Sequence, residues 1–152
     1  TEYLSDKKDI GYRVLYNDDL VLVASPAWAD KLNGEPVIPQ TLSQIPLLVY
    51  EEAFNYIHQY YLEVFNEDSV NRPIITVEDL SIIHGLLCEG TGYSVLPKYL
   101  VADDLASGKL VQLHQPEKPP QHTLYLLWNK FSMRKSRNLF TREAILKAAE
   151  KW

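Results

Sequence analysis

The sequence predicts an α/β fold, in which strands and helices alternate along one chain of 152 residues. Short apolar runs with the length of buried strands recur, and segments with apolar residues at helical spacing separate most of them. The composition is that of a folded domain, because 46% of the residues are hydrophobic and 23% are charged. We therefore expect an α/β protein with mostly parallel strands.

The first predicted elements surround a continuously apolar strand. Residues 12–16 alternate as in a half-exposed strand, and residues 20–24 are apolar throughout, as in a strand buried on both faces. Ser25 and Pro26 are a good N-cap and first-turn residue, so a helix is expected from there to about Leu32. Asn33 and Gly34 are expected to end that helix.

The middle of the chain predicts two helices around a buried strand at residues 47–50. Residues 41–44 have the spacing of a capping box, with room for one turn before Pro46. Asn55 is expected to cap the next helix. One face of that helix is apolar and consists of Ile57, Tyr60, Tyr61, Val64 and Phe65.

The second half of the chain continues the alternation. Further strands are expected at residues 74–77, 93–96, 110–113 and, buried, 124–128. Helices are expected at residues 79–89, 98–106 and 136–151. The last of these places Phe140, Ala144, Ala148 and Trp152 on one stripe. Gly90 is expected to end its helix in the left-handed region, and Gly92 to leave room for a tight turn with a positive φ.

Acidic residues follow two of the predicted strands. Glu51 and Glu52 follow one strand, and Glu78 and Asp79 follow another. Paired carboxylates can perform acid/base catalysis of the glycosidase kind. Acids that complement a helix dipole explain them better, so we expect no catalytic residue here.

His84 and Cys88 lie four residues apart on a predicted helix and therefore share a face. Two such ligands can begin a zinc site. The sequence has no second pair at ligand spacing, so a buried cysteine and a hydrogen-bonded histidine are the favoured interpretation and no metal site is expected. No Walker loop, G-x-S-x-G elbow or H-E-x-x-H motif is present, and we expect no cofactor.

The net charge of -5 argues against binding nucleic acid, which requires a basic face. Basic residues between Lys130 and Arg142 are better explained as a solvated face than as a phosphate site. The single cysteine excludes an internal disulfide, and no apolar run approaches the length of a membrane span. We therefore expect a cytoplasmic protein with no membrane partner.

Polar residues at the carboxyl ends of the predicted strands suggest a binding site. Ligands of open parallel sheets lie beyond these ends, where helices begin and offer free N–H groups. In this chain the positions are 50–55, 77–81 and 96–98, with Tyr50 and Ser81 as hydroxyl donors. Convergent polar groups without a nucleophile and base indicate binding rather than catalysis.

Three blocks of the sequence together resemble the effector-binding domain of LysR-type transcriptional regulators. They are the segment DLVLVASP at 19–26, the segment at 76–97 that contains CEGTGYSVLP, and LYLLWNK at 124–130. The similarity extends over about residues 11–149.

The resemblance implies a periplasmic-binding-protein-like (type 2) fold with an effector cleft between two lobes. Residues 26–122 would form a complete second lobe, and residues 9–25 and 123–152 the crossover strands and a remnant of the first lobe. We accordingly expect a partial, N-terminally truncated domain. Its bacterial parent protein would bind DNA through a helix-turn-helix that is absent here, and would form a homo-oligomer.

We expect the effector to contact Tyr50, Glu51, Glu78, Asp79 and Ser81. Ser81 and its helix start would donate to an anionic group, and the glutamates would favour an amine, so a zwitterionic or cationic small molecule is expected. Two alternatives stay open at this point: an exported solute-binding protein of the same fold, and an enzyme built on the same lobes.

Overall fold

The computed structural model describes residues 9–50, 54–68 and 71–150. The chain divides into two compact units. The central unit comprises residues 18–122, and the terminal unit comprises residues 1–17 and 123–152. Strand β1, Ile10–Ala24, contributes residues to both units.

The central unit holds most of the regular structure. Its strands besides β1 are β2 Leu48–Tyr50, β3 Ile75–Val77, β4 Tyr93–Pro97 and β5 Val111–His114. Its helices are α2 Pro26–Leu32, α3 Pro39–Leu42, α4 Phe54–Tyr60, the π-helix η1 Tyr61–Phe65, α5 Leu80–Cys88 and α6 Lys98–Ser107.

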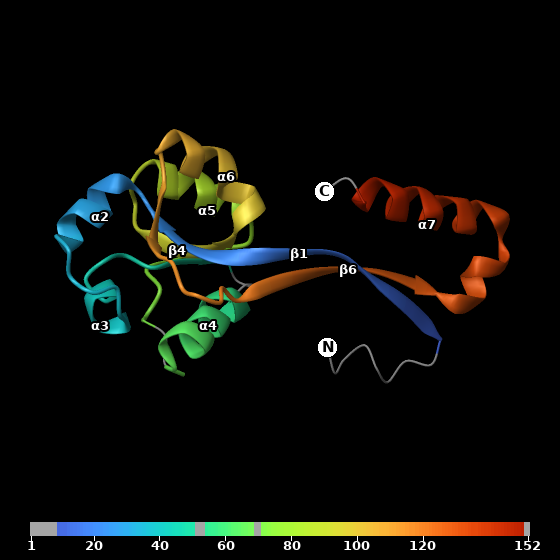
Figure 1. Ribbon diagram of the computed structural model, residues 1–152, viewed down its shortest axis with the longest axis horizontal. Helices are drawn as coiled ribbons and strands as arrows, with labels where there is room; N and C mark the ends of the chain where they lie inside the picture. The colour runs from blue at the N-terminus through green and yellow to red at the C-terminus, as the bar shows by residue number, and fades with distance from the viewer. Residues whose placement is uncertain (1–8, 51–53, 69–70, 151–152) are drawn as a thin grey trace. The chain divides into compact units, whose positions relative to one another are not determined.

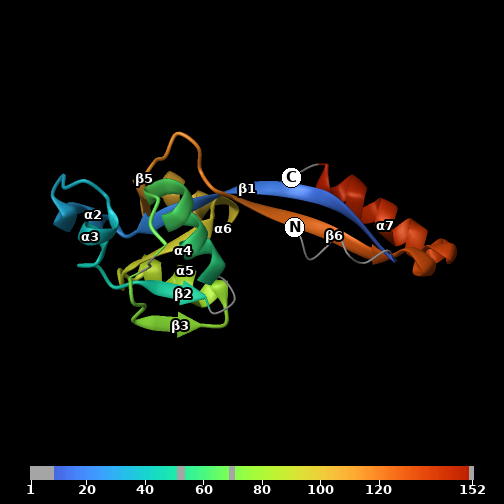
Figure 2. The ribbon, with the colours of Figure 1, turned by 90° about the horizontal axis from the view of Figure 1, so that it is seen from below.

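Strand β1 has a neighbour on each side within the central unit. Residues 20–24 pair antiparallel with β4, and residues 22–24 pair antiparallel with β5. Strands β2 and β3 form a separate parallel pair, seen side by side in Figure 2. The expectation of mostly parallel strands is therefore wrong for the larger sheet, because side-chain periodicity predicts a strand but not its direction.

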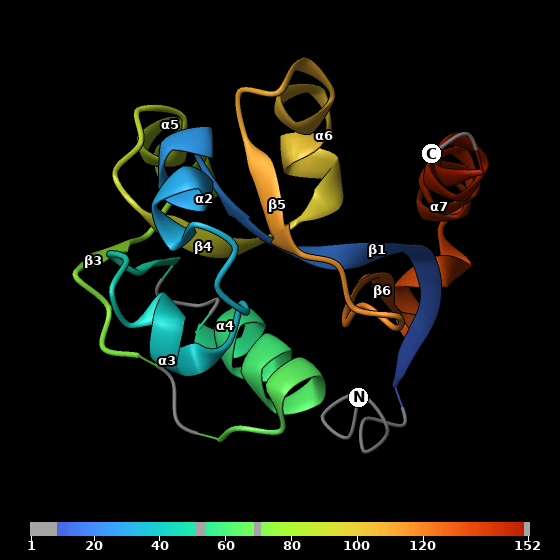
Figure 3. The ribbon, with the colours of Figure 1, turned by 60° about the vertical axis from the view of Figure 1, so that its left-hand side comes forward.

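The buried part of β1 lies between two cores. Its side chains alternate: Leu20, Leu22 and Ala24 belong to one core, and Val21 and Val23 to the other. Helices α3 and α4 lie on one side of this strand, and α5 and α6 lie on the opposite side (Figures 1 and 3). The five-residue apolar run is thus buried on both faces, as expected.

Helix α4 and the π-helix η1 cover the first core with the face that the sequence predicts. Ile57, Tyr60 and Tyr61 are buried, and Val64 and Phe65 pack against them. Helices α5 and α6 cover the second core through Ile83, Leu87 and Val101, together with partly buried neighbours such as Leu86.

Several predicted helix starts need correction. Asn55 is not a cap, because α4 already begins at Phe54. Helix α3 begins at Pro39, so Thr41 lies inside it; its hydroxyl accepts from the Ile38 amide at 3.2 Å instead of opening a new helix. Ser25 occupies the N-cap position of α2, but its hydroxyl makes no capping bond.

The terminal unit contains strand β6, Gln121–Asn129, which begins in the central unit, the 3-10 helix η2, Lys130–Arg134, and helix α7, Ser136–Ala149. Strand β6 pairs with β1. Because β1 runs from Ile10 to Ala24, the segments predicted separately at 12–16 and 20–24 are one strand. Its later residues pair with β4 from Leu20 and with β5 from Leu22 onward.

Strand β6 is not buried, which corrects the expectation for residues 124–128. Leu124 and Leu127 are exposed, because burial of a strand requires an element packed over its faces as well as a paired neighbour. The predicted stripe of α7 is also exposed at Phe140, Ala144 and Ala148. Trp152, its fourth member, lies outside the described residues.

Gly90 and Gly92 have different functions in the turn between α5 and β4. Gly90 has φ +77°, so it ends the helix in the left-handed region as expected. Gly92 does not have a positive φ, and that part of the expectation is wrong. A Cβ atom at Gly92 would instead lie 2.1 Å from the Pro46 carbonyl oxygen, so glycine is needed for close backbone approach.

We predict that Gly92→Ala lowers the free energy of unfolding by about 3 kcal/mol or more, because the added methyl group collides with a backbone atom that cannot rotate away. Urea denaturation measures the change. Gly85→Ala is the matched control: it lies in α5 with open space around its Cβ position, and should stabilise by about 0.5–1 kcal/mol. Equal effects of the two substitutions would contradict the prediction.

The first core contains a buried polar group made of two tyrosines and one asparagine. The Tyr61 and Tyr93 hydroxyls lie 2.8 Å apart, and the Asn71 side-chain amide donates to both, at 3.1 and 3.2 Å. Burial raises the pKa of Tyr61 and Tyr93, and also that of Tyr60, above the usual 10.0. In each case the neutral phenol is the form that the folded protein favours.

These raised pKa values predict alkaline unfolding. Stability is fully present below pH 10.0, the unfolded value, and falls as the pH rises above it, by about 1.4 kcal/mol per pH unit for each such tyrosine. Urea denaturation over a pH series measures the slope. Tyr60→Phe should reduce the slope of stability against pH by the contribution of one tyrosine, about 1.4 kcal/mol per pH unit. Complete ionisation of all ten tyrosines near pH 10 in a protein that is still folded would rule this out.

Candidate functional site

Several elements of the central unit end or begin at one edge. Tyr50 and Val77, the last residues of β2 and β3, are paired in register. Leu47 and Tyr93 form a parallel bridge, so β4 runs in the same direction as β2 and ends at the same edge. Helix α5 begins just after β3, and α6 directly after β4. This edge, which we call the carboxyl edge, is where polar groups were expected to converge.

The structure places four of the five predicted site residues along the carboxyl edge. Tyr50 is half-buried, whereas Glu78, Asp79 and Ser81 are exposed. Glu51 lies outside the described residues. The Asp79 carboxylate accepts a hydrogen bond from the Ser81 amide at 2.7 Å and so caps α5. The Ser81 N–H group, which was expected to donate to an anion, is therefore occupied by a carboxylate of the protein itself.

Three aromatic residues that the sequence analysis missed lie at the same edge. The Tyr56 hydroxyl lies 3.1 Å from His122 Nδ1, and the two rings meet edge to face. Burial raises the pKa of Tyr56 above its usual value, and the nearby phenols of Tyr99 and Tyr50 raise it further. The three tyrosines belong to α4, α6 and β2, and Tyr99 and Tyr50 lie where α6 begins and β2 ends.

Asp18 holds the start of α6 at this edge. This carboxylate is buried and accepts a hydrogen bond from the Tyr99 amide at 2.9 Å. Pro97, at the N-cap position of α6, has no side-chain oxygen to offer, so a residue of β1 satisfies the helix instead. Asp18 and Tyr99 are 81 positions apart, and no local sequence pattern could have indicated this contact.

The carboxyl edge therefore presents phenol hydroxyls, an imidazole and carboxylates around three strand ends. Such groups can donate and accept hydrogen bonds and pack against a small polar molecule. Tyr56 and Tyr99 follow the expected segments at 50–55 and 96–98 by one residue each, so a slightly wider window would have included them.

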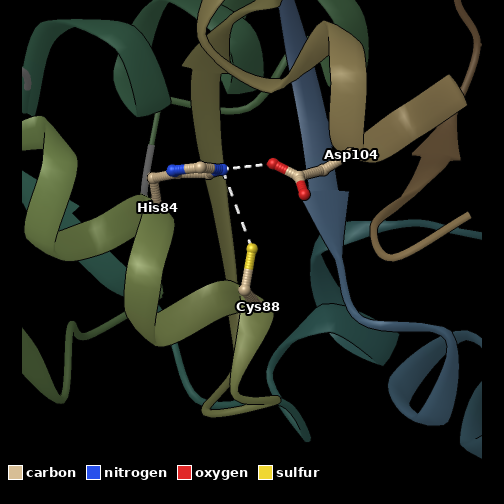
Figure 4. Close-up of side chains that lie close together, drawn as sticks. All are labelled: His84, Cys88 and Asp104. Carbon is tan, nitrogen blue, oxygen red and sulfur yellow. Dashed lines mark hydrogen bonds and ion pairs between the residues drawn. The ribbon is translucent and has the colours of Figure 1, made fainter. Parts of the chain in front are cut away.

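A second polar cluster joins α5 and α6 away from this edge (Figure 4). His84 Nε2 lies 2.5 Å from Asp104 Oδ2 and 3.7 Å from Cys88 Sγ. In a nucleophile–histidine–acid triad, the nucleophile and the acid contact different nitrogens of the ring. Here both contact Nε2, so this cluster lacks the geometry of a proton relay.

Comparison with known proteins identifies the family and agrees with the fold. The family model described as the LysR substrate binding domain matches residues 2–147. The HTH-type transcriptional regulator AbaB of Streptomyces antibioticus is 30% identical over 116 residues, which are 74% of this chain and 38% of AbaB. BbuR of Bordetella bronchiseptica, also an HTH-type transcriptional regulator, is 27% identical over 127 residues, 83% of this chain and 38% of BbuR. The chain thus spans less than half the length of these curated relatives.

The backbone is similar to that of a solved regulatory domain, from the LysR-type transcriptional regulator CrgA of Neisseria meningitidis. The TM-score is 0.75 at 20% identity, with 95% of this chain and 71% of that chain covered. This likeness confirms the periplasmic-binding-protein-like (type 2) fold. Among the residues that the structure describes, no helix combines the length and apolarity needed to cross a membrane.

We predict that Asp18→Ala lowers the free energy of unfolding by about 1–2 kcal/mol, because the amide at the start of α6 loses its acceptor. Asp18→Asn keeps a side-chain oxygen and should cost less. Asp19→Ala is the control, since the Asp19 carboxylate accepts an exposed bond from Gln121, and it should change stability by no more than about 0.5 kcal/mol. Denaturation curves in urea compare the three; equal losses at positions 18 and 19 would show that Asp18 has no capping function.

Proposed function

This chain belongs to the family of LysR substrate-binding domains, and from that premise we propose that it senses a small-molecule effector for a bacterial LysR-type transcription factor. The observation that supports the location of the site is the carboxyl edge. There Tyr50 ends β2, Tyr99 begins α6, and Tyr56 of α4 contacts His122 of β6.

We propose that residues 26–122 form the second lobe of the domain, with residues 9–25 and 123–152 as crossover strands and part of the first lobe. The parent protein would bind DNA through its own helix-turn-helix segment, form a homo-oligomer and work in the cytoplasm. The family is one of transcriptional regulators, and we propose that the chain binds its effector without transforming it. The family match favours this function over an exported solute-binding protein.

The charge of the carboxyl edge favours an effector that contains an amine. Glu78 and Asp79 are exposed there, and the Ser81 amide is occupied by Asp79 and not available to an anion. Carboxylates attract an ammonium group and repel a dianion. A zwitterionic or cationic molecule, held by Tyr50, Glu51, Glu78, Asp79 and Ser81, therefore suits this edge better than a dicarboxylate.

A thermal-shift screen of the purified protein tests this proposal. Amino acids and amines should raise the melting temperature, whereas dicarboxylates of similar size should not, because only a ligand bound to the folded state stabilises it. Titration calorimetry on the best ligand then gives its affinity.

Glu78→Gln should weaken binding of the best amine by roughly tenfold, the change expected from one lost charge-assisted contact. Glu35→Gln is the matched control, since Glu35 follows α2 at the opposite end of the buried part of β1, and it should leave affinity unchanged. A clear preference for dianions, or equal effects of the two substitutions, would overturn the proposed ligand chemistry.

A further inference from the structure

The cluster on α5 and α6 has the composition of a metal site. His84 and Cys88 are one turn apart on α5. The His84 ring points toward Asp104 of α6, and Cys88 Sγ points toward the same ring nitrogen (Figure 4). The sequence spacing indicates that His84 and Cys88 share a face. Asp104 joins them only because α6 packs against α5. Among the described residues, this is the group of three whose ligand atoms lie close enough to share one ion.

The ligand atoms of the cluster can reach the spacing around a tetrahedral zinc ion through small side-chain movements. The nitrogen, sulfur and oxygen atoms all lie within 4.8 Å of one another. Zinc bonds of about 2.0–2.3 Å place two ligand atoms roughly 3.3–3.6 Å apart. The 3.7 Å between Cys88 Sγ and His84 Nε2 already matches this spacing. The 2.5 Å between His84 and Asp104 would have to widen by less than about 1 Å, which a side-chain rotation provides.

The helices hold these three groups in place. Ile83 and Leu87, which directly precede the two ligands on α5, are fully buried in the second core, as is Val101 of α6. The backbone positions are therefore fixed by packing and do not depend on an ion. The side chains of His84 and Asp104 keep 29% and 19% of their exposure, so an ion can enter from solvent.

The donor atoms select the kind of ion. Thiolate and imidazole ligands favour zinc and similar borderline-soft ions, whereas magnesium and calcium prefer oxygen ligands alone. Three protein ligands leave a fourth position for water, which is typical of an exchangeable or reactive site and not of a closed structural one.

We propose that His84, Cys88 and Asp104 form a three-ligand site for a divalent ion of the zinc class, which links α5 to α6 and exchanges with solvent. This site is separate from the carboxyl edge and does not depend on the proposed effector.

Cobalt titration of the purified, reduced protein tests the proposal. Cys88 is the only cysteine of the chain, so a thiolate-to-cobalt charge-transfer absorption can come from this residue alone. We expect that absorption to saturate at one equivalent, and one equivalent of zinc to abolish it. An excess of magnesium should not.

Three substitutions identify the ligands. Cys88→Ser should abolish the absorption. His84→Gln and Asp104→Asn should each weaken cobalt binding by at least about 100-fold, since loss of even an outer-shell partner costs about 10–100-fold. Asp103→Asn, an exposed neighbour on α6, is the matched control and should leave binding unchanged. Circular dichroism and thermal unfolding without metal verify that each variant is folded.

Two results would overturn the proposal. One is the absence of the charge-transfer absorption in the folded, reduced protein. The other is cobalt affinity that is equal in the wild type, His84→Gln and Asp104→Asn, which would mean that the thiolate alone captures the ion. A zinc-induced rise in melting temperature that disappears in Asp104→Asn provides an independent measurement of the same linkage.

Discussion

Burial of Leu20–Ala24 on both faces is the constraint on which the central unit depends. Successive side chains of a strand point to opposite faces of the sheet, so five consecutive apolar residues need helices packed on both faces. Helices α3 and α4 supply one cover and α5 and α6 the other, and β4 and β5 occupy both edges. This strand therefore contributes to both cores, and removing its apolar character would open both of them.

The position of the candidate site follows from the pairing of this strand. Because β4 runs antiparallel to β1, the end of β4 and the start of α6 lie next to the residues that precede Leu20. Asp18 can then cap α6. The Pro120 carbonyl oxygen accepts a hydrogen bond from the Leu20 amide. This bond holds the start of β6 beside β1, and His122 of β6 then contacts Tyr56. One pairing thus gathers groups from the beginning, middle and end of the central unit.

Sequence reasoning succeeded where a structural signal is local. Pro26 and Asn33 bracket α2 as expected, and Gly90 ends α5 in the left-handed region. It failed where the deciding neighbour is distant. Gly92 needs to be glycine because of Pro46, not because of its own φ. Strand β6 has the apolar composition of a buried strand, but burial requires a covering element, and composition says nothing about that.

The sequence by itself determined the alternation of elements, the doubly buried strand, most helix ends and the family resemblance. All of these depend on periodicity and capping within a few residues, because the position of a residue in a helix or strand sets the direction of its side chain. Tertiary structure alone decided the strand directions, the capping of α6 by Asp18 and the meeting of Asp104 with His84 and Cys88. Those contacts join residues that are 81 and 20 positions apart, and only the packing of whole elements against two shared cores brings them together.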